Sequence, residues 1–199
     1  MAYTPLSICN LGLGKIGQAR LVNIDNPKHE FEGLARDGYP HWRDSELTKR
    51  RWRFATRKVL LSLIRTDDDK DRPYVFEVPK TALRLVRTKR TRWVRFTDLE
   101  LRSPNSTEEV EIIFRVAEDN FTAEFAEVLA CRVAQEMVEP VTQSNEKFEK
   151  ATRLYAQALA DAARLNAFEL EEHTLTTPDD YSEWVDARSN PYGVMDYDG

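Results

Sequence analysis

Two long amphipathic segments joined by a short turn constrain this chain more than any other feature. Residues 121–139 repeat an apolar residue every fourth position, which places the set on one helical face: Phe125, Leu129, Val133 and Met137. Residues 145–170 repeat apolar residues at spacings of three and four. Pro140 is expected to end the first helix because proline has no N–H, and Ser144 is expected to cap the second. A helix over residues 145–170 spans about 40 Å, so the pair indicates a structural role.

The remaining sequence predicts further helices near the N-terminus and a small sheet in the middle. Helical spacing is found over residues 6–17 and 28–64, where Pro40 either kinks one helix or separates two. Residues 74–116 change to short alternating runs of β-branched and aromatic residues, which favour strands, and the candidates are residues 83–86, 93–96 and 110–116. We therefore expect an α+β fold, mainly α: a long-helix bundle with a small antiparallel β region inserted in the middle. One domain is expected over residues 1–177, followed by an extended C-terminal tail over residues 178–199.

Composition indicates a folded chain with a hydrophobic core. Hydrophobic residues make up 41% of the sequence, which argues against disorder. Six large side chains on the predicted helical faces are expected to be mostly buried. They are Trp52, Phe54, Phe125, Leu129, Phe148 and Tyr155. The longest apolar run, residues 59–64, is far too short to cross a bilayer, so no membrane partner is expected.

The net charge of −5 conceals a strong asymmetry along the chain. Residues 41–102 carry 18 Lys and Arg against nine Asp and Glu, whereas residues 103–199 carry seven against 21. Charge alone favours solvated faces, which is what most charge runs are. The more specific interpretations are head-to-tail complementarity between copies of the chain, or a basic surface that meets a polyanion.

Motifs for catalysis, cofactors and metals lack the context that their chemistry needs. Gly12, Gly14 and Gly17 match the dinucleotide fingerprint G-x-G-x-x-G, but no buried strand precedes them and no helix and second strand follow. Three alternate acids in residues 67–71 resemble a calcium loop without its glycine and its bidentate glutamate. The three histidines have no zinc-ligand spacing, and there is no G-x-S-x-G elbow. Cys9 and Cys131 lie far apart, as expected of a reduced, cytosolic protein. We therefore expect no enzyme, no cofactor and no metal.

A basic segment over residues 84–102 is the candidate surface for nucleic acid. It interleaves aromatic residues with five cations: Arg87, Lys89, Arg90, Arg92 and Arg95. Sheets that bind nucleic acid combine cations with stacking aromatics in this way. The alternative is an ordinary half-exposed strand, with Trp93 and Arg95 on one face and Val94 and Phe96 on the other.

Several landmarks together resemble the head-to-tail adaptor family of tailed bacteriophages, whose short-tailed members are called tail tubular protein A. They follow one another in the family's order, and the match extends to about Arg188. The landmarks are ICNLGLGKIG at residues 8–17, Trp52-Arg-Phe54-Ala55, Val78-Pro79 with Leu83-Arg84-Leu85, the helix from Phe121 through Ala134, and the turn at residues 140–144 with the helix after it.

The resemblance implies a ring protein, usually dodecameric, seated between the portal and the tail and surrounding the channel through which genomic DNA leaves. The implied partners are other copies of the chain, the portal protein, a downstream tail or nozzle protein and DNA that passes without sequence-specific binding. The implied location is the head–tail junction of the virion, after synthesis in the host cytoplasm. The tail is expected to grip the portal or a neighbouring subunit through residues of types that anchor interfaces. These residues are Tyr181, Trp184, Arg188, Tyr192 and Tyr197.

Two other functions remain open at this point. One is a nucleic-acid-binding module that uses the basic segment, and salt-dependent DNA binding by a monomer would favour it. The other is a nucleotide-dependent oxidoreductase built on Gly12, Gly14 and Gly17. The basic residues of the segment face the tail or the DNA channel if the adaptor interpretation holds.

Overall fold

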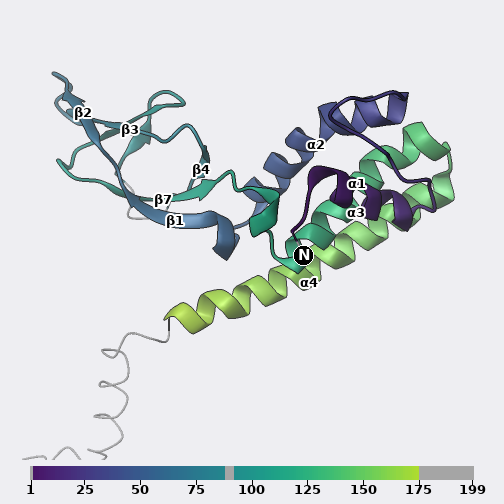
Figure 1. Cartoon of the computed structure of the whole chain (residues 1–199). Helices are drawn as coiled ribbons and strands as arrows, with labels where there is room; N and C mark the ends of the chain where they lie inside the picture. The colour runs from purple at the N-terminus through teal and green to yellow at the C-terminus, as the bar shows by residue number, and fades with distance from the viewer. Residues whose placement is uncertain (1, 88–91, 175–199) are drawn as a thin grey trace, which may run out of the picture.

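The chain folds into a helical lobe and a smaller β lobe that lie side by side (Figure 1). This computed structural model describes residues 2–87 and 92–174, with side chains through Glu169. Four α-helices and two small antiparallel sheets make up the described part, so the predicted class, α+β and mainly α, is confirmed.

The helical lobe is built around α3 (Ala123–Thr142), which packs against the other three helices. These are α1 (Pro5–Lys15), α2 (Glu30–Lys49) and α4 (Asn145–Thr174). The repeat that the sequence shows in α3 is its buried face, and Phe125, Leu129 and Met137 have no exposed surface. A helix that is apolar on so much of its circumference must lie in the centre of a bundle.

Local signals account for the beginnings of α1 and α4. Thr4 accepts a hydrogen bond from the backbone of Ser7 in a reciprocal capping box, so α1 begins at Pro5. The side chain of Ser144 accepts from the backbone N–H of Lys147 at 3.4 Å, as expected of the N-cap of α4.

The predicted end of α3 at Pro140 is wrong. The helix continues through the proline to Thr142 and ends at Gln143, whose φ of 51° is left-handed. Proline removes one hydrogen bond to the preceding turn, and this loss falls in the last turn, where the helix is about to end. The exposed position of Pro140 leaves its ring facing solvent.

The predicted helix over residues 28–64 is also wrong in its second half. Helix α2 passes through Pro40 as one helix and ends at Lys49. After a single 3-10 turn, η1 (Arg53–Ala55), the chain forms β1 (Thr56–Leu60) and β2 (Leu63–Thr66). The β region therefore begins at Thr56, not at residue 74, because partners far along the chain pair with this segment.

The β lobe contains two antiparallel sheets. One has the order β1-β7-β4, where β7 is Glu109–Phe114 and β4 is Ala82–Leu85. The other has the order β2-β3-β6-β5, where β3 is Tyr74–Glu77, β6 is Glu100–Ser103 and β5 is Val94–Arg95. The predicted strands near residues 83–86, 93–96 and 110–116 are thus confirmed with shifted ends.

A separate small core holds the two sheets together. It draws side chains from both of them: Leu61, Phe76, Val78, Leu85, Trp93, Leu101, Val110 and Ile112. Only Leu61 and Ser62 separate β1 from β2, so one nearly continuous extended segment borders both sheets. We call residues 56–66 the shared edge.

The burial of the six predicted core side chains is confirmed in part. Trp52, Phe125 and Leu129 are buried, and Phe54 and Tyr155 pack partly buried against the same core. Phe148 is 43% exposed, so its prediction is wrong. It lies in the first turn of α4, where the helix faces the turn after α3 and not the body of the bundle.

Candidate interaction surfaces

The glycine motif lies on a helix. Gly12 and Gly14 belong to α1, and Gly17 follows its end with a φ of +66°. A Cβ on Gly12 would come within 2.6 Å of the carbonyl oxygen of Ala130, so this glycine permits close packing of α1 on α3. The strand–loop–helix arrangement that a dinucleotide fingerprint needs is absent from residues 2–87, where the motif is located.

The other candidate chemical groups are occupied by structural contacts. Asp67 pairs with Arg65 and Arg102, while Asp69 accepts backbone hydrogen bonds from Asp71 and Arg72, which lower its pKa. Within the described ranges, no group of three or more metal-ligating side chains comes together. Burial raises the pKa of the Cys9 thiol to about 12, so this cysteine is protonated and unreactive.

The basic segment is less available than its sequence suggests. Arg95 pairs with Asp98 and donates to nearby carbonyls, and Arg102 pairs with two acids of the loop before β3. The carbonyl of Arg92 accepts from Arg72 at 3.3 Å. Lys89 and Arg90 lie outside the described residues. Ion pairing within the lobe therefore consumes part of the positive charge that a polyanion would need.

One cation of the segment is placed against an aromatic ring. The guanidinium of Arg87 lies 5.3 Å from the ring centroid of Trp93 and donates to its carbonyl at 3.3 Å. This is a cation–π contact, but Trp93 is 4% exposed and belongs to the core of the β lobe. The ring therefore offers little surface on which a base could stack.

Separate landmarks of the sequence meet in one aromatic cluster at the base of the helical lobe. The ring centroids of Trp52 and Phe125 are 5.1 Å apart, and those of Phe121 and Phe125 are 4.8 Å apart. Phe54 packs at 6.0 Å from Phe121. Edge-to-face arrangements of this kind are favourable beyond the area they bury. The cluster joins the chain after α2 to the beginning of α3.

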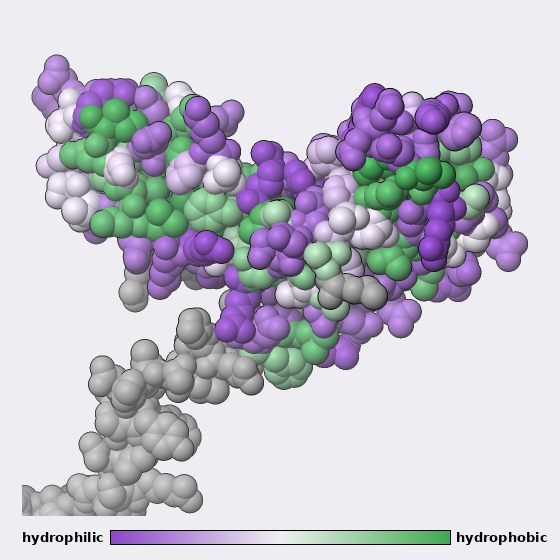
Figure 2. Space-filling view, viewed as in Figure 1, coloured by the Kyte–Doolittle hydropathy of each residue, from purple (hydrophilic) through white to green (hydrophobic). Residues whose placement is uncertain are grey.

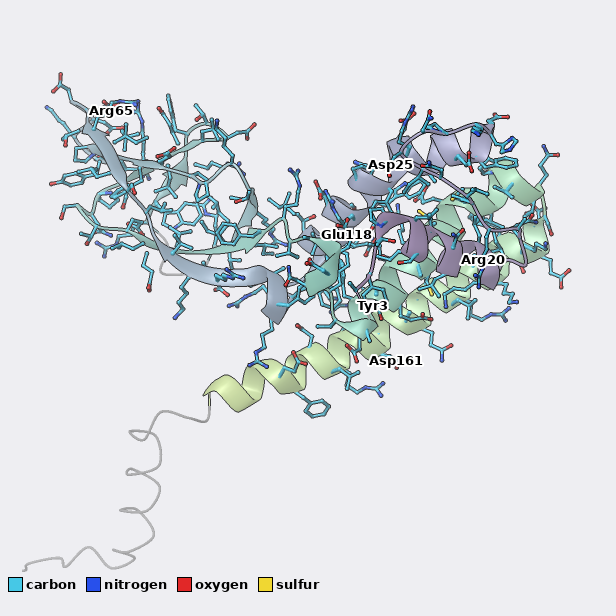
Figure 3. The ribbon with its side chains drawn as sticks, in the orientation of Figure 1. Tyr3, Arg20, Asp25, Arg65, Glu118 and Asp161 are labelled. Atoms are coloured by element: carbon cyan, nitrogen blue, oxygen red, sulfur yellow. The ribbon has the colours of Figure 1, made fainter. Side chains whose placement is uncertain are left out.

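Charged side chains connect the two lobes. Arg115, just after β7, donates to Asp44 on α2 at 2.9 Å. Arg43 donates to Glu118 at 3.0 Å, and Glu118 lies between the lobes (Figure 3). Arg51 pairs with Glu111 on β7. The Arg43–Glu118 pair is partly buried, whereas the guanidiniums of Arg115 and Arg51 are about half exposed. The three pairs link β7 and the chain after it to α2 and to the residues just after α2.

A buried carboxylate links three helices, which the sequence did not reveal. Glu46 on α2 has no exposed surface. Its carboxylate accepts from Lys49 at 2.5 Å and from the hydroxyl of Tyr155 on α4 at 3.0 Å, and Arg132 on α3 lies 3.9 Å away. Several partners offset the desolvation that a buried charge incurs. Heptad-like spacing in α2 places Glu46 on an inner face, but no local signal names its partners.

A second carboxylate orders the loop before α2. The side chain of Glu32 accepts from the backbone N–H groups of Val22, Asn23, Lys28 and His29. These hydrogen bonds, that of Lys28 foremost, lower the pKa of Glu32 to about 2. Glu32 therefore attaches the loop between α1 and α2 to the helical lobe, together with Asn10 on α1, whose side-chain amide makes two hydrogen bonds with the backbone of Leu21.

The outer half of α4 extends past the helical lobe beneath the β lobe (Figure 1). The side-chain amide of Asn166 bridges to the chain before β1, accepting from the N–H of Arg53 and donating to the carbonyl of Arg51, both at 2.9 Å. Leu165 and Phe168 beside it are 48% and 59% exposed. Apolar side chains on a projecting helix are typical of a contact surface.

The shared edge presents apolar side chains to solvent. Leu60, Leu63 and Ile64 are 68%, 47% and 48% exposed. Figure 2 shows hydrophobic surface over the β lobe on the face in view. Arg65, at the far end of this edge, lies at the outer tip of the lobe (Figure 3). Because β1 and β2 are each the last strand of their sheet, each has an unpaired edge in the described part of the chain.

The predicted tail anchors, Tyr181, Trp184, Arg188, Tyr192 and Tyr197, lie outside the described residues.

No helix in the described part combines the length and the apolar character needed to span a membrane. No protein-family model matches the chain, and no curated protein matches it.

Proposed function

We propose that this chain is a structural head-to-tail adaptor of a tailed bacteriophage. Copies form a ring, dodecameric by the family resemblance, that sits under the portal protein, attaches the downstream tail or nozzle protein and continues the channel for DNA ejection. The protein acts in the virion as a connector and not as an enzyme. It contacts DNA without reading its sequence.

The convergence of the resembling landmarks carries this proposal. Trp52 and Phe54 of one landmark pack against Phe121 and Phe125 of another. Gly12 of the first landmark, on α1, lies against Ala130, which is on α3 like Phe125. Segments far apart in the sequence thus form one packing unit, as expected if the landmarks were inherited together as the base of one fold.

The distribution of surfaces also supports a connector. Three features suit contacts between unlike faces of neighbouring copies. They are the projecting half of α4, the unpaired strand edges of the β lobe and the opposite charges of the middle and C-terminal segments. Such heterologous contacts close into a ring when the rotation between copies permits. The tail residues Tyr181, Trp184, Arg188, Tyr192 and Tyr197 are proposed to grip the portal or the next subunit.

Native mass spectrometry of the full-length chain, alone and with the portal protein of the same virus, tests the proposal. We expect a closed ring of defined copy number, either alone or on the portal. A chain that stays monomeric with the portal across a wide concentration range contradicts the adaptor function. Negative-stain images of the same samples distinguish rings from open chains of subunits.

A second candidate function, nucleic-acid binding through the basic segment, is favoured by the exposed positions of Arg87 and Arg92. Fluorescence anisotropy with single- and double-stranded DNA at several salt concentrations tests it, because phosphate contacts make affinity salt-dependent. Arg87→Gln should weaken binding if the segment is the site. Arg36→Gln, which removes an exposed cation from α2 in the other lobe, is the matched control. Salt-dependent binding by a monomer would favour this function over the adaptor.

A further inference from the structure

We infer that the groove between α3 and α4 is the docking site for a helix of another protein, one that carries lysine and arginine beside a strip of aliphatic side chains. This site goes beyond the proposed function, because it belongs to the helical lobe of each copy and does not require that copies form a ring. We call it the α3–α4 groove. Its lining includes Glu124, Glu127, Leu154, Ala158, Asp161 and Leu165.

One wall of the groove is a mainly apolar strip along α4. Leu154, Ala158, Asp161 and Leu165 follow one another at spacings of four, three and four residues, so they lie on one side of the helix. Phe168 continues this spacing one turn later, and both Leu165 and Phe168 are about half exposed. From Leu154 to Phe168 the strip is about 21 Å long. It therefore matches a helix of about four turns.

The backbone of α4 determines the form of the occupant. Residues 154–168 lie in the interior of a helix that runs from residue 145 to residue 174, so their N–H and C=O groups are bonded within that helix. A strand has no free backbone groups to pair with at this surface. A helix that lays an apolar face into the groove makes its contacts through side chains, and it covers the strip.

Acids on both walls of the groove select a basic helix. Glu124 and Glu127 lie one turn apart on α3 and are exposed, as is Asp161 on α4. Glu127 pairs with Lys15. The carboxylate of Asp161 lies 3.9 Å from the guanidinium of Arg164, and Glu124 makes no ion pair within the described part of the chain. Lysine and arginine beside the apolar face of the occupant would complement these acids.

The surface around the groove has the same sign of charge. Residues 117–174, which comprise α3, α4 and the residues that lead into them, contain 12 Asp and Glu against five Lys and Arg. Such a surface repels DNA and anionic membranes. It attracts a positively charged protein helix, and salt weakens the attraction.

No helix in the described part of the chain has the required character, so the occupant is another protein. The exposed side of α2 balances Arg36 with Asp37, and α1 contains a single cation. An antiparallel second copy of α4 that paired Leu154 with Leu165 would bring the two Asp161 side chains within one turn of each other. Like charges placed together in this way oppose association.

Two synthetic helices added to the full-length protein test the inference. Both peptides carry leucine at heptad positions a and d, and one carries lysine at positions e and g where its twin carries glutamate. Fluorescence anisotropy should show that the lysine peptide binds at least about tenfold more tightly than its twin, with a smaller difference at high salt. Equal binding of the two peptides, or no binding of the lysine peptide at about 1 mM, overturns the inference.

Charge variants at exposed positions locate the binding site. Glu124→Gln with Asp161→Asn should weaken binding of the lysine peptide about tenfold and reduce its advantage over its twin. The matched control is Glu146→Gln with Glu149→Gln, which neutralises two exposed acids in the first two turns of α4 and should leave binding unchanged. An equal loss in the control would show that the peptide responds only to overall charge, and the inference would fail.

Apolar variants test the strip itself. Leu165→Ser with Phe168→Ser should weaken binding of the lysine peptide at least about tenfold. Leu60→Ser with Ile64→Ser removes similarly exposed side chains from the β lobe and should have no effect. Unchanged melting temperatures establish that each variant is folded. If sedimentation velocity shows that the groove variants, and not the control, weaken self-association, the occupant is a second copy and the inference fails.

The adaptor function is judged by a different measurement. Rings on the portal, formed by a chain that does not distinguish the two peptides, would leave the adaptor function standing and overturn the docking site. Binding of the lysine peptide in the groove by a chain that stays monomeric with the portal would support the docking site and contradict the adaptor function.

Discussion

The hydroxyl of Tyr155 on α4 donates to the carboxylate of Glu46 on α2, with oxygen–oxygen distances of 3.0 and 3.1 Å. Because Glu46 is fully buried, Tyr155→Phe should lower the free energy of unfolding by about 1–3 kcal/mol. Urea denaturation of Tyr155→Phe, Glu46→Gln and the double variant measures the coupling between the two groups, which we expect to exceed about 0.5 kcal/mol. Additive effects would show that the hydrogen bond contributes nothing specific.

The two glycines of α1 provide a matched pair. Gly12→Ala places a methyl group against the carbonyl of Ala130 and should destabilise the protein by about 1–3 kcal/mol. Gly14→Ala meets nothing within 4 Å and should leave stability unchanged or raise it by up to about 1 kcal/mol. The melting temperatures of the two variants check this contrast.

Neither glycine variant should change calorimetric titrations with NAD or FAD, in which we expect no heat of binding. Binding that a Gly14→Val change removes would revive the oxidoreductase hypothesis.

Acid should weaken the attachment that Glu32 gives to the loop before α2. The pKa of this carboxyl is about 2 in the folded protein and near 4.5 ordinarily, so its contribution is complete above about pH 4.5 and is lost as the pH falls towards 2. Glu32→Gln should therefore be less stable than the wild type at pH 7, and the difference should shrink between pH 4.5 and 2. Glu149→Gln, an exposed change on α4, should show no such convergence. A difference in melting temperature between Glu32→Gln and the wild type that stays constant from pH 7 to pH 2 would contradict the assignment.

Burial separates two aromatic residues that the sequence placed in one core. Trp52→Ala should cost about 3–5 kcal/mol, because the ring is 2% exposed and its Nε1 donates to the carbonyl of Glu46. Phe148→Ala, at a side chain 43% exposed, should cost less than about 1 kcal/mol. Denaturant midpoints of both variants check the contrast. Equal losses would mean that Phe148 packs against something else in solution.

Removal of the C-terminal segment should separate folding from assembly. A chain that ends before Pro178 keeps every side chain of both described cores, so its melting temperature should match that of the full chain. Its assembly into rings or onto the portal should be abolished. Native mass spectrometry of the two chains side by side gives the answer, and assembly of the truncated chain with normal affinity would reduce the segment to a solvated end.

The sequence predicted what depends on local pattern. The face of α3, the N-cap at Ser144 and the strands around Leu83 and Val110 all follow from periodicity and capping chemistry. The stretch after Lys49 did not follow, because its apolar residues fit helical and extended spacing alike. Its strands form only because β7 and β3 supply partners many residues later in the chain.

The candidate surfaces were harder to predict than the fold. The sequence shows how many cations residues 84–102 contain, but only the fold shows that Arg95 and Arg102 are paired with acids. The buried position of Glu46 depends on side chains from two other helices. The unpaired edges of β1 and β2 depend on strand order, which periodicity alone does not determine.

Asn166 has a mechanical consequence. Its amide bonds the backbone on both sides of Trp52, so the outer half of α4 holds the chain immediately before β1 in the way that a neighbouring strand would. Because β1 leads directly into β2, which belongs to the other sheet, this contact lies at the entry to the whole β lobe. The α4 helix therefore supports the β lobe as well as the helical bundle, although the two lobes have separate cores.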